Sequence, residues 1–218
     1  MKFDILTLFP NSFSYFDDSI IKRAKEKKII DINIINIRDF SSDKHKSVDD
    51  TPYGGGVGML MKFEPIYDAL KEIKKSKKTE VILFSPTGKK FDQKMAKKLL
   101  KLDHIIMISG HYEGVDARVE KIIDEKISIG DYVLTNGNLP AMILVDSISR
   151  LIPGVLGNLE SFKLDSFYDD NTLEYPQYTK PEIVEINGKK YKVPKVLVSG
   201  DHGKIDKWRK EKTEKLKI

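Results

Sequence analysis

The chain has 218 residues, of which 40% are hydrophobic and 33% are charged, and its formal net charge is +5. This composition is typical of a globular protein and excludes a disordered chain. The sequence has no run of about 18 apolar residues, which excludes a membrane-spanning helix. It has no cysteine, which excludes disulfides and thiolate metal sites and favours a cytoplasmic location.

The first two thirds of the chain predict alternating strands and helices. Strands are expected at 2–8 and 30–37, joined by a helix whose apolar residues recur at helical spacing: Phe13, Phe16, Ile20 and Ala24. A polar, glycine-rich stretch spans 38–62. The pattern then predicts, in order, helix 64–75, strand 80–84, helix 91–102, strand 105–109, a short helix over 115–123, a strand near 127–134 and helix 139–152. This alternation indicates parallel strands in an α/β layer architecture.

The pattern changes after Pro153. A loop of about 25 residues follows, which is too long for the interior of one compact domain and is interpreted as a functional linker. EIVEINGKKYKV then predicts a hairpin with Asn187-Gly188 as its turn. A short strand at 195–198 and a basic helix from about 202 complete a small second domain.

Positive charge is concentrated at the C-terminal end. From Ile186 onward, eleven Lys and Arg residues stand against four Asp and Glu, a net charge of +7, whereas the preceding residues carry 27 against 29. A basic tail on a near-neutral body indicates a polyanionic partner, nucleic acid before membrane. A lysine-rich, solvated helix would give the same pattern.

Three turns follow predicted strands: 85–88, 109–114 and 129–137. In α/β sheets ligands bind at the carboxyl ends of the strands, so the three turns together predict a shared pocket, although each alone fits ordinary turn chemistry. The glycine-rich motifs do not identify a nucleotide. PYGGGVGM does not follow a strand as a dinucleotide fingerprint would, and the segment 85–89 lacks the upstream glycine of a P-loop.

Short motifs recur in a fixed order along nearly the whole chain: Leu8-Phe9-Pro10; His45 and then VDDTPYGGGVGM to Met59; Ser85-Pro86-x-Gly88; Gly110-x-Tyr112-Glu113-Gly114-x-Asp116-x-Arg118; SIGDYVL at 128–134; SRLIPGVLG at 149–157; Asp165-Ser166-Phe167; PQYTKP at 176–181; and VLVSGDHGKIDKWR at 196–209. In this combination they resemble one family closely. It is the bacterial tRNA (guanine-N1)-methyltransferases of the SPOUT class, which modify guanosine 37, the nucleotide 3′ of the anticodon.

The resemblance implies an α/β fold with a parallel sheet and a C-terminal trefoil knot, an exception to the rule that chains are un-knotted. It implies a knotted domain over 1–158 that binds S-adenosyl-L-methionine, a linker over 159–174, and a small, basic, mainly helical tRNA-binding domain over 175–218. It also implies a cytoplasmic homodimer with the active site at the subunit interface, and a need for Mg²⁺.

The resemblance assigns the chemistry to two residues. Asp165 would be the general base that removes the proton from guanine N1, and Arg150 would stabilise the charge that develops on O6. From the residues alone, Asp165 also fits a helix cap or turn, and Arg150 fits an ion pair with Asp146. The methyl donor would be bound largely by main-chain groups of Ser85, Pro86, Gly110, Glu113, Ile129, Gly130, Asp131, Tyr132, Val133, Leu134, Gly137 and Pro140.

The resemblance also assigns substrate and metal contacts. tRNA would be bound by His45, Asp49, Asp50, Gly55, Lys207 and Arg209, and Mg²⁺ by Glu113 and Asp165. From the residues alone, His45 also fits a surface loop, Glu113 a helix cap, and Trp208 either a small core or a platform on which a base stacks.

The chain departs from the usual family residues at His111, Ala117, Asn136, Asn138 and Lys180. Two further hypotheses are a SPOUT enzyme that methylates another base or ribose, and a non-catalytic RNA-binding protein. The failed fingerprint disfavours an NAD-dependent oxidoreductase.

Overall fold

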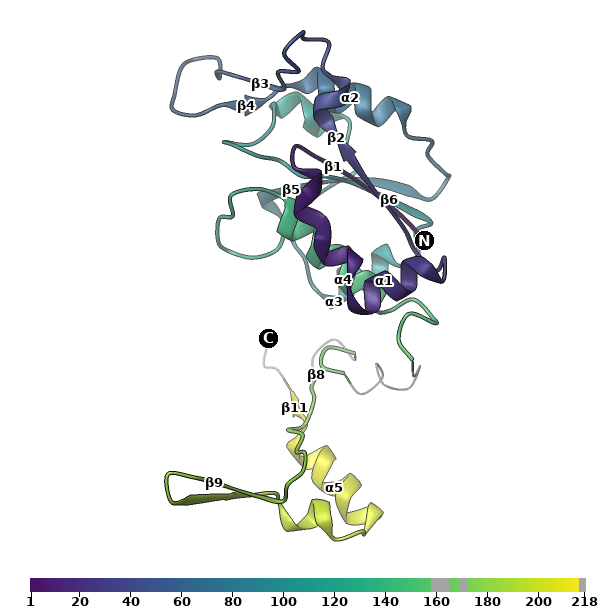
Figure 1. Cartoon of the computed structure of the whole chain (residues 1–218), viewed down its shortest axis with the longest axis vertical. Coiled ribbons are helices and arrows are strands. Elements are labelled where there is room, and N and C mark those ends of the chain that lie inside the picture. Colours follow the sequence, from purple (N-terminus) through teal and green to yellow (C-terminus); the bar gives the residue numbers. More distant parts are fainter. Residues whose placement is uncertain (158–164, 169–171, 216–218) are drawn as a thin grey trace. The chain divides into compact units, whose positions relative to one another are not determined.

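The computed structural model describes residues 1–157, 165–168 and 172–215. The chain forms two compact units, Met1–Gly157 and Asn158–Ile218 (Figure 1). The sequence analysis ends the first domain at residue 158. Residues 159–164 and 169–171 of the predicted linker lie outside the described residues, so the linker stays a prediction.

The first unit is built on a five-stranded sheet in the order β2-β1-β6-β5-β7. Its strands are β1 (Lys2–Thr7), β2 (Asp31–Asn36), β5 (Thr79–Lys90), β6 (His104–Ile108) and β7 (Glu125–Ser128). Every neighbouring pair is parallel, which confirms the predicted α/β class with a parallel sheet. Residues of β1 and β6 are buried on both faces, as expected for strands covered by helices on both sides.

Helices cover both faces of this sheet (Figure 1). One apolar layer joins alternate strand residues such as Phe3, Ile5 and Met107 to the helices α1 (Ser19–Glu26), α3 (Gln93–Leu99) and α4 (Asn138–Ser149). The other layer joins Leu6, Ile106 and Ile108 to α2 (Phe63–Glu72) and to the 3-10 helices η2 (Ile37–Phe40) and η3 (Ala117–Lys121). Because successive side chains of a strand point to opposite faces of the sheet, the strands contribute residues to two apolar cores, one on each face.

A polar pair lies inside the sheet. Asp4 and His104 are nearly fully buried, and His104 Nε2 lies 2.8 Å from Asp4 Oδ2. Asn33 donates to the other carboxylate oxygen, and Lys2 Nζ lies 2.9 Å from Oδ2. Burial lowers the pKa of His104 although Asp4 opposes this shift. We therefore describe the contact as a neutral imidazole that donates to a carboxylate.

Four predicted elements of the first unit are wrong in their extent or type. The helix expected over residues 13–24 is broken into the 3-10 helix η1 (Pro10–Asp17) and α1, because Asp18 adopts an extended backbone and its side chain accepts from Ser19 N–H. β5 continues past residue 84 to Lys90, and β7 ends at Ser128, where the pocket-forming loop begins. The segment 115–123 forms the 3-10 helix η3, because the Asp116 side chain caps it and i→i+3 bonds close it.

The described part of the second unit combines short strands and helices. β8 (Thr172–Leu173) pairs with β11 (Glu214–Lys215), and β9 (Ile183–Ile186) pairs with β10 (Lys189–Lys192). The hairpin prediction is confirmed: Asn187 and Gly188 both have positive φ, as a type I′ turn requires. α5 (His202–Lys212) is the basic helix.

The strand predicted at 195–198 is wrong. The segment forms the 3-10 helix η5 (Lys195–Val198), because the Pro194 carbonyl accepts from Leu197 N–H and closes a tight turn. The mainly helical character of the second domain and the trefoil knot of the first stay predictions.

Candidate active site

A pocket of about 330 Å³ lies at the carboxyl edge of the sheet, where β5, β6 and β7 lead into three turns. Eleven of the twelve residues predicted to contact the methyl donor line it: Ser85, Pro86, Gly110, Glu113, Ile129, Gly130, Tyr132, Val133, Leu134, Gly137 and Pro140. Asp131 does not line it, and its exposed carboxylate pairs with Lys90 instead. Three turns that are separate in sequence thus form one cavity, as the pattern of strand ends predicts.

The turn at 85–88 interrupts β5. The register between β5 and β7 shifts between Phe84 and Lys89, so the four residues between them loop out while the strand continues beyond. A Cβ atom at Gly88 would lie 2.5 Å from the backbone nitrogen of Ile127, which is too close for any side chain. Glycine at this position lets the looped-out residues 85–88 pack closely against β7. Ser85 and Pro86, in the same loop, line the pocket.

The loop that follows β7 packs against the loop that follows β6. Gly137 N–H donates to the Gly110 carbonyl at 2.9 Å, and a Cβ atom at Gly137 would lie 2.8 Å from Ser109 Cα. The buried Asn138 side chain strengthens this contact, since its Oδ1 accepts from Thr7 at 2.9 Å and from Ser109 at 2.6 Å. The ends of β1 and β6 and the start of α4 are therefore joined by one amide oxygen.

The glycine-rich segment is attached to the same turn. Glu113 N–H donates to the Met59 carbonyl, and Met61 N–H donates to the Gly114 carbonyl. A Cβ atom at Gly58 would lie 2.5 Å from the Glu113 side chain. Gly58 has φ +92°, a region in which other residues are strained. The segment predicted to cover the substrate is thus in direct contact with the predicted donor turn.

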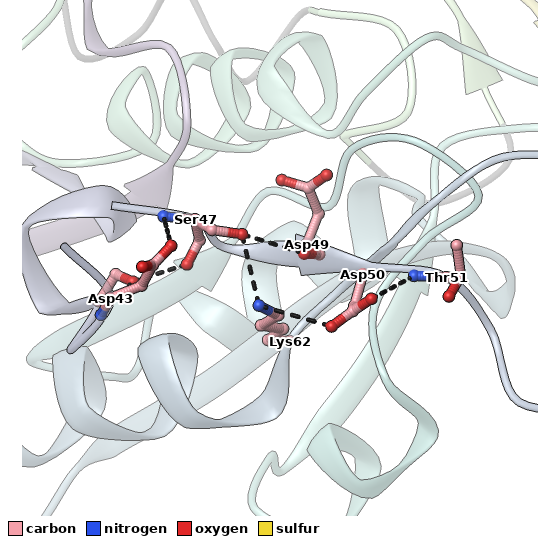
Figure 2. A network of polar contacts seen from close by, with 7 residues as sticks. Asp43, Ser47, Asp49, Asp50, Thr51 and Lys62 are labelled. Carbon is pink, nitrogen blue, oxygen red and sulfur yellow. Dashed lines mark hydrogen bonds and ion pairs between the residues drawn. The ribbon is translucent and has the colours of Figure 1, made fainter. Parts of the chain in front are cut away.

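The predicted substrate residues Asp49 and Asp50 lie on a polar network that Figure 2 shows from close by, and the third, His45, is joined to it through its backbone N–H. Asp43 accepts from the backbone of His45 and Ser47, and these bonds lower the pKa of Asp43. Asp50 accepts from Thr51 N–H, and its carboxylate lies 3.6 Å from Lys62 Nζ. The Asp49 side chain points away from this network (Figure 2).

This network is anchored to the sheet of two short strands, β3 (Asp49–Asp50) and β4 (Leu60–Met61). Gly55 lies in the loop between them with φ +80°, and a Cβ atom there would meet no other atom within 4 Å. The backbone at Gly55 is therefore open to a ligand.

The two predicted chemical residues lie in different units. Arg150 is the C-terminal cap of α4 in the first unit, and its N–H donates to the Asp146 carbonyl at 3.1 Å. Asp165 begins a turn in the second unit, where its carbonyl accepts from Tyr168 N–H. The Asp146 side chain, the alternative partner of Arg150, accepts a hydrogen bond from the Tyr15 hydroxyl, which raises the pKa of Tyr15.

The predicted RNA-binding cations Lys207 and Arg209 lie on α5. Arg209 stacks over the Tyr175 ring at 5.2 Å and lies 3.5 Å from Asp206, while Lys207 lies 4.0 Å from Glu211. Trp208 contacts Tyr175 and Tyr178, each with ring centroids 6.4 Å apart. Trp208 is half-buried, which leaves both interpretations of this residue open.

The family described as tRNA (Guanine-1)-methyltransferase TrmD matches residues 1–217. The chain is 54% identical to a tRNA (guanine-N(1)-)-methyltransferase of Clostridium tetani over 99% of its own length and 88% of that relative's. It is also 54% identical to the enzymes of that name from Clostridioides difficile, covering 94% of the relative, and Ruminiclostridium cellulolyticum, covering 91%. The chain belongs to the tRNA (guanine-1)-methyltransferase family.

For a member of this family, the sequence analysis missed several pocket residues. His111, Tyr112, Gly114, Thr135 and Asn136 lie in the two turns already singled out, and Val115 directly follows the first of them, so continuity could have found all six. Tyr112 has φ +59°, which is unusual for a bulky residue and typical of functional turns. Glu120 comes from η3, and no signal in the sequence places it at the pocket.

Two general features were also tested. Among the described residues, no helix is long and apolar enough to cross a membrane. Within residues 1–157, 165–168 and 172–215, no three His, Asp or Glu side chains gather into a candidate metal site. Glu113 and Asp165, the predicted Mg²⁺ ligands, belong to different units.

Proposed function

We propose that this protein transfers a methyl group from S-adenosyl-L-methionine to N1 of guanosine 37 in tRNA. The observation that carries the proposal is the pocket at the carboxyl edge of the sheet. Eleven of the twelve residues that the family resemblance assigns to the donor line this one cavity. The family membership of nearly the whole chain supports the same reaction.

The residues present fit such a donor. The pocket is formed by three turns, and close packing of Gly88 and Gly137 against neighbouring backbone leaves no room for a side chain at these two turn positions. Its volume of about 330 Å³ is at the lower end of the range for small-molecule sites. When bound, the donor supplies an electrophilic sulfonium methyl group. The protein then has to activate the acceptor.

The proposed mechanism assigns that activation to Asp165 and Arg150. Guanine N1 carries a proton at neutral pH, so a carboxylate must take this proton as the N1–methyl bond forms. The negative charge left on the ring moves to O6, where the Arg150 guanidinium stabilises it. Arg150 caps the C-terminal end of α4, the end opposite to Gly137 and Pro140, which line the pocket. Magnesium stays a prediction, with Glu113 and Asp165 as its candidate ligands.

The proposed tRNA contacts are divided between the units. His45, Asp49, Asp50 and Gly55 belong to the segment attached to the Glu113 turn. Lys207 and Arg209 belong to a helix that carries five exposed Lys and Arg residues against two acidic ones, which suits the phosphates of an anticodon stem.

We also propose that the enzyme is a homodimer with its active site at the subunit interface. α4 presents Leu139 and Ile143 to solvent, and the neighbouring pocket loop presents Tyr132 and Val133, the last 83% exposed. Since Tyr132 and Val133 also line the pocket, a second copy that covers this apolar surface would complete the cavity. Sedimentation of the protein should show a dimer, and the double variant Val133→Glu/Ile143→Glu should sediment as a monomer and lose activity.

The decisive experiment is transfer of labelled methyl from S-adenosyl-L-methionine to an unmodified tRNA transcript in the presence of Mg²⁺. Label should map to N1 of guanosine 37 and should be absent from a transcript with adenosine at that position. Asp165→Asn should abolish transfer while donor binding persists. Equal labelling of both transcripts would contradict the position, and full activity of Asp165→Asn would favour a SPOUT enzyme with a different target. Failure to bind the donor would favour a non-catalytic RNA-binding protein.

A further inference from the structure

His111 is held at the pocket wall by its main chain and by two aromatic neighbours. Its N–H donates to Met61 Sδ, its carbonyl accepts from Gly114 N–H, and it forms a β-bridge with Asn136. The imidazole centroid lies 4.9 Å from the Phe9 ring and 4.6 Å from the Tyr112 ring. These contacts fix the position of a ring that lines the pocket.

The two ring nitrogens of His111 differ in their surroundings. Nδ1 is fully enclosed and has no hydrogen-bond partner among the described residues, whereas Nε2 is not enclosed in this way. Leaving a buried N–H unpaired is rarer in proteins than leaving a buried acceptor unpaired. The ring proton is therefore assigned to Nε2, which makes His111 a hydrogen-bond donor in the pocket wall.

The surroundings of His111 indicate which ligand it meets. The charged groups that act on the ring are Arg38 of η2 and Asp49 of β3, and Asp49 belongs to the proposed substrate segment. Phe9 and Tyr112 are each about two fifths exposed, so flat apolar rings flank the imidazole. Proteins recognise an unstacked RNA base with this combination of ring faces and a hydrogen bond to the base edge.

We propose that His111 is a base-recognition residue whose Nε2–H donates a hydrogen bond to N7 of the target guanine. The assignment rests on the proposed function, in which N1 and O6 are taken by Asp165 and Arg150. N7 is the acceptor that remains on the edge next to O6. His111 then distinguishes a purine that carries N7, while Phe9 and Tyr112 supply the surfaces against which the base lies.

The test pairs variants of the protein with a variant of the substrate. His111→Phe keeps an aromatic ring against Phe9 and Tyr112 and removes the donor, whereas His111→Gln keeps a neutral N–H at a similar reach. Two transcripts are compared, one with guanosine and one with 7-deazaguanosine at the target position. Steady-state methyl transfer gives KM for tRNA and kcat, and calorimetry with S-adenosylhomocysteine gives donor affinity.

We expect His111→Phe to raise KM for the guanosine transcript roughly tenfold, the value of one hydrogen bond, and His111→Gln to recover most of this loss. For the unmodified protein, KM should be higher by a similar factor with the 7-deazaguanosine transcript than with the guanosine transcript. For His111→Phe, the two transcripts should give the same KM. The proposal would be overturned if His111→Phe and 7-deazaguanosine raised KM independently, so that their factors multiplied. It would also be overturned if 7-deazaguanosine left KM of the unmodified protein unchanged, or if His111→Phe lowered only the affinity for the donor. An unmodified protein inactive on the guanosine transcript would instead refute the proposed function.

Discussion

The two units of the chain are held together differently. In the first unit, apolar side chains from both faces of the sheet are completely buried, from Phe3 and Ile5 to Leu144 and Ile148. In residues 165–168 and 172–213 of the second unit, every side chain is at least partly exposed, and the contacts include those of Trp208 and Arg209 with tyrosine rings. Burial therefore stabilises the first unit, while the basic second unit keeps its side chains accessible to solvent.

The largest expected effect tests this difference directly. Leu144→Ala removes a fully buried side chain from α4 and should lower the free energy of unfolding by about 4 kcal/mol, because the cavity cannot collapse. Leu197→Ala, its matched control in η5, removes a half-buried side chain and should cost less than about 1 kcal/mol. Urea unfolding followed by circular dichroism measures both. Equal losses would show that the second unit also depends on a packed core.

A second substitution addresses the buried polar pair of the first unit. Asp4→Ala leaves His104, Asn33 and Lys2 without their common acceptor and should cost about 3 kcal/mol in urea unfolding. The second unit contains no comparable buried network among its described residues. Hydrogen exchange should therefore increase throughout the sheet and stay unchanged in α5, and increased exchange in α5 would contradict the separation of the two units.

The same pair predicts how stability depends on pH. Burial holds the pKa of His104 below its usual value, so the folded protein binds a proton there less readily than the unfolded chain. Stability is therefore fully present above about pH 6.5 and decreases as the pH falls toward the lowered pKa of the folded state. His104→Gln should show a shallower decrease between pH 7 and 5 in urea unfolding. An unchanged slope would show that other groups carry the pH dependence.

The sequence predicted the parallel sheet well, because strands such as IIMIS are apolar runs bounded by turns. It also predicted most of the pocket, since residues that follow parallel strands meet at one edge. It could not predict the excursion at 85–88, because the register shift that continues β5 depends on the close approach of Gly88 to Ile127. Glu120 was missed for the same reason, since only the fold brings η3 to the pocket.

Asp131 is the one predicted donor residue that does not line the pocket. It belongs to a motif that lines the pocket, yet adjacent residues of a loop point in different directions, and its carboxylate turns to Lys90. The predicted strand at 195–198 failed because β-branched residues favour a strand only when a neighbouring strand is available to pair with.

Removing positive charge from the second unit should weaken RNA binding and leave the first unit unchanged. Lys207→Ala/Arg209→Ala should reduce the affinity for tRNA about tenfold and lower the slope of log affinity against log salt by about 2. The double control Lys71→Ala/Lys74→Ala removes two cations near the end of α2 in the first unit and should change neither quantity by much. Filter binding across a salt series measures this. Equal losses for both pairs would indicate nonspecific electrostatic attraction.

The smallest expected effect compares two helix caps. Asp92 accepts from Met95 N–H at the start of α3, and Asp201 accepts from Lys204 N–H at the start of α5. Asp92→Ala should lower the unfolding free energy of the first unit by about 1 kcal/mol. Asp201→Ala should shorten or fray α5 without changing the stability of the sheet, which segment-resolved hydrogen exchange can measure. Destabilisation of the sheet by Asp201→Ala would show that the two units unfold together.

The contacts of Trp208 have a practical consequence. It is the chain's single tryptophan, and it lies in the second unit beside Tyr175 and Tyr178. Its intrinsic fluorescence therefore reports on the basic unit alone, without labels and without interference from the sheet. Because the chain has no cysteine, one introduced thiol in the first unit would accept a dye uniquely. Energy transfer from Trp208 to that dye would then follow the movement of one unit relative to the other as substrate binds.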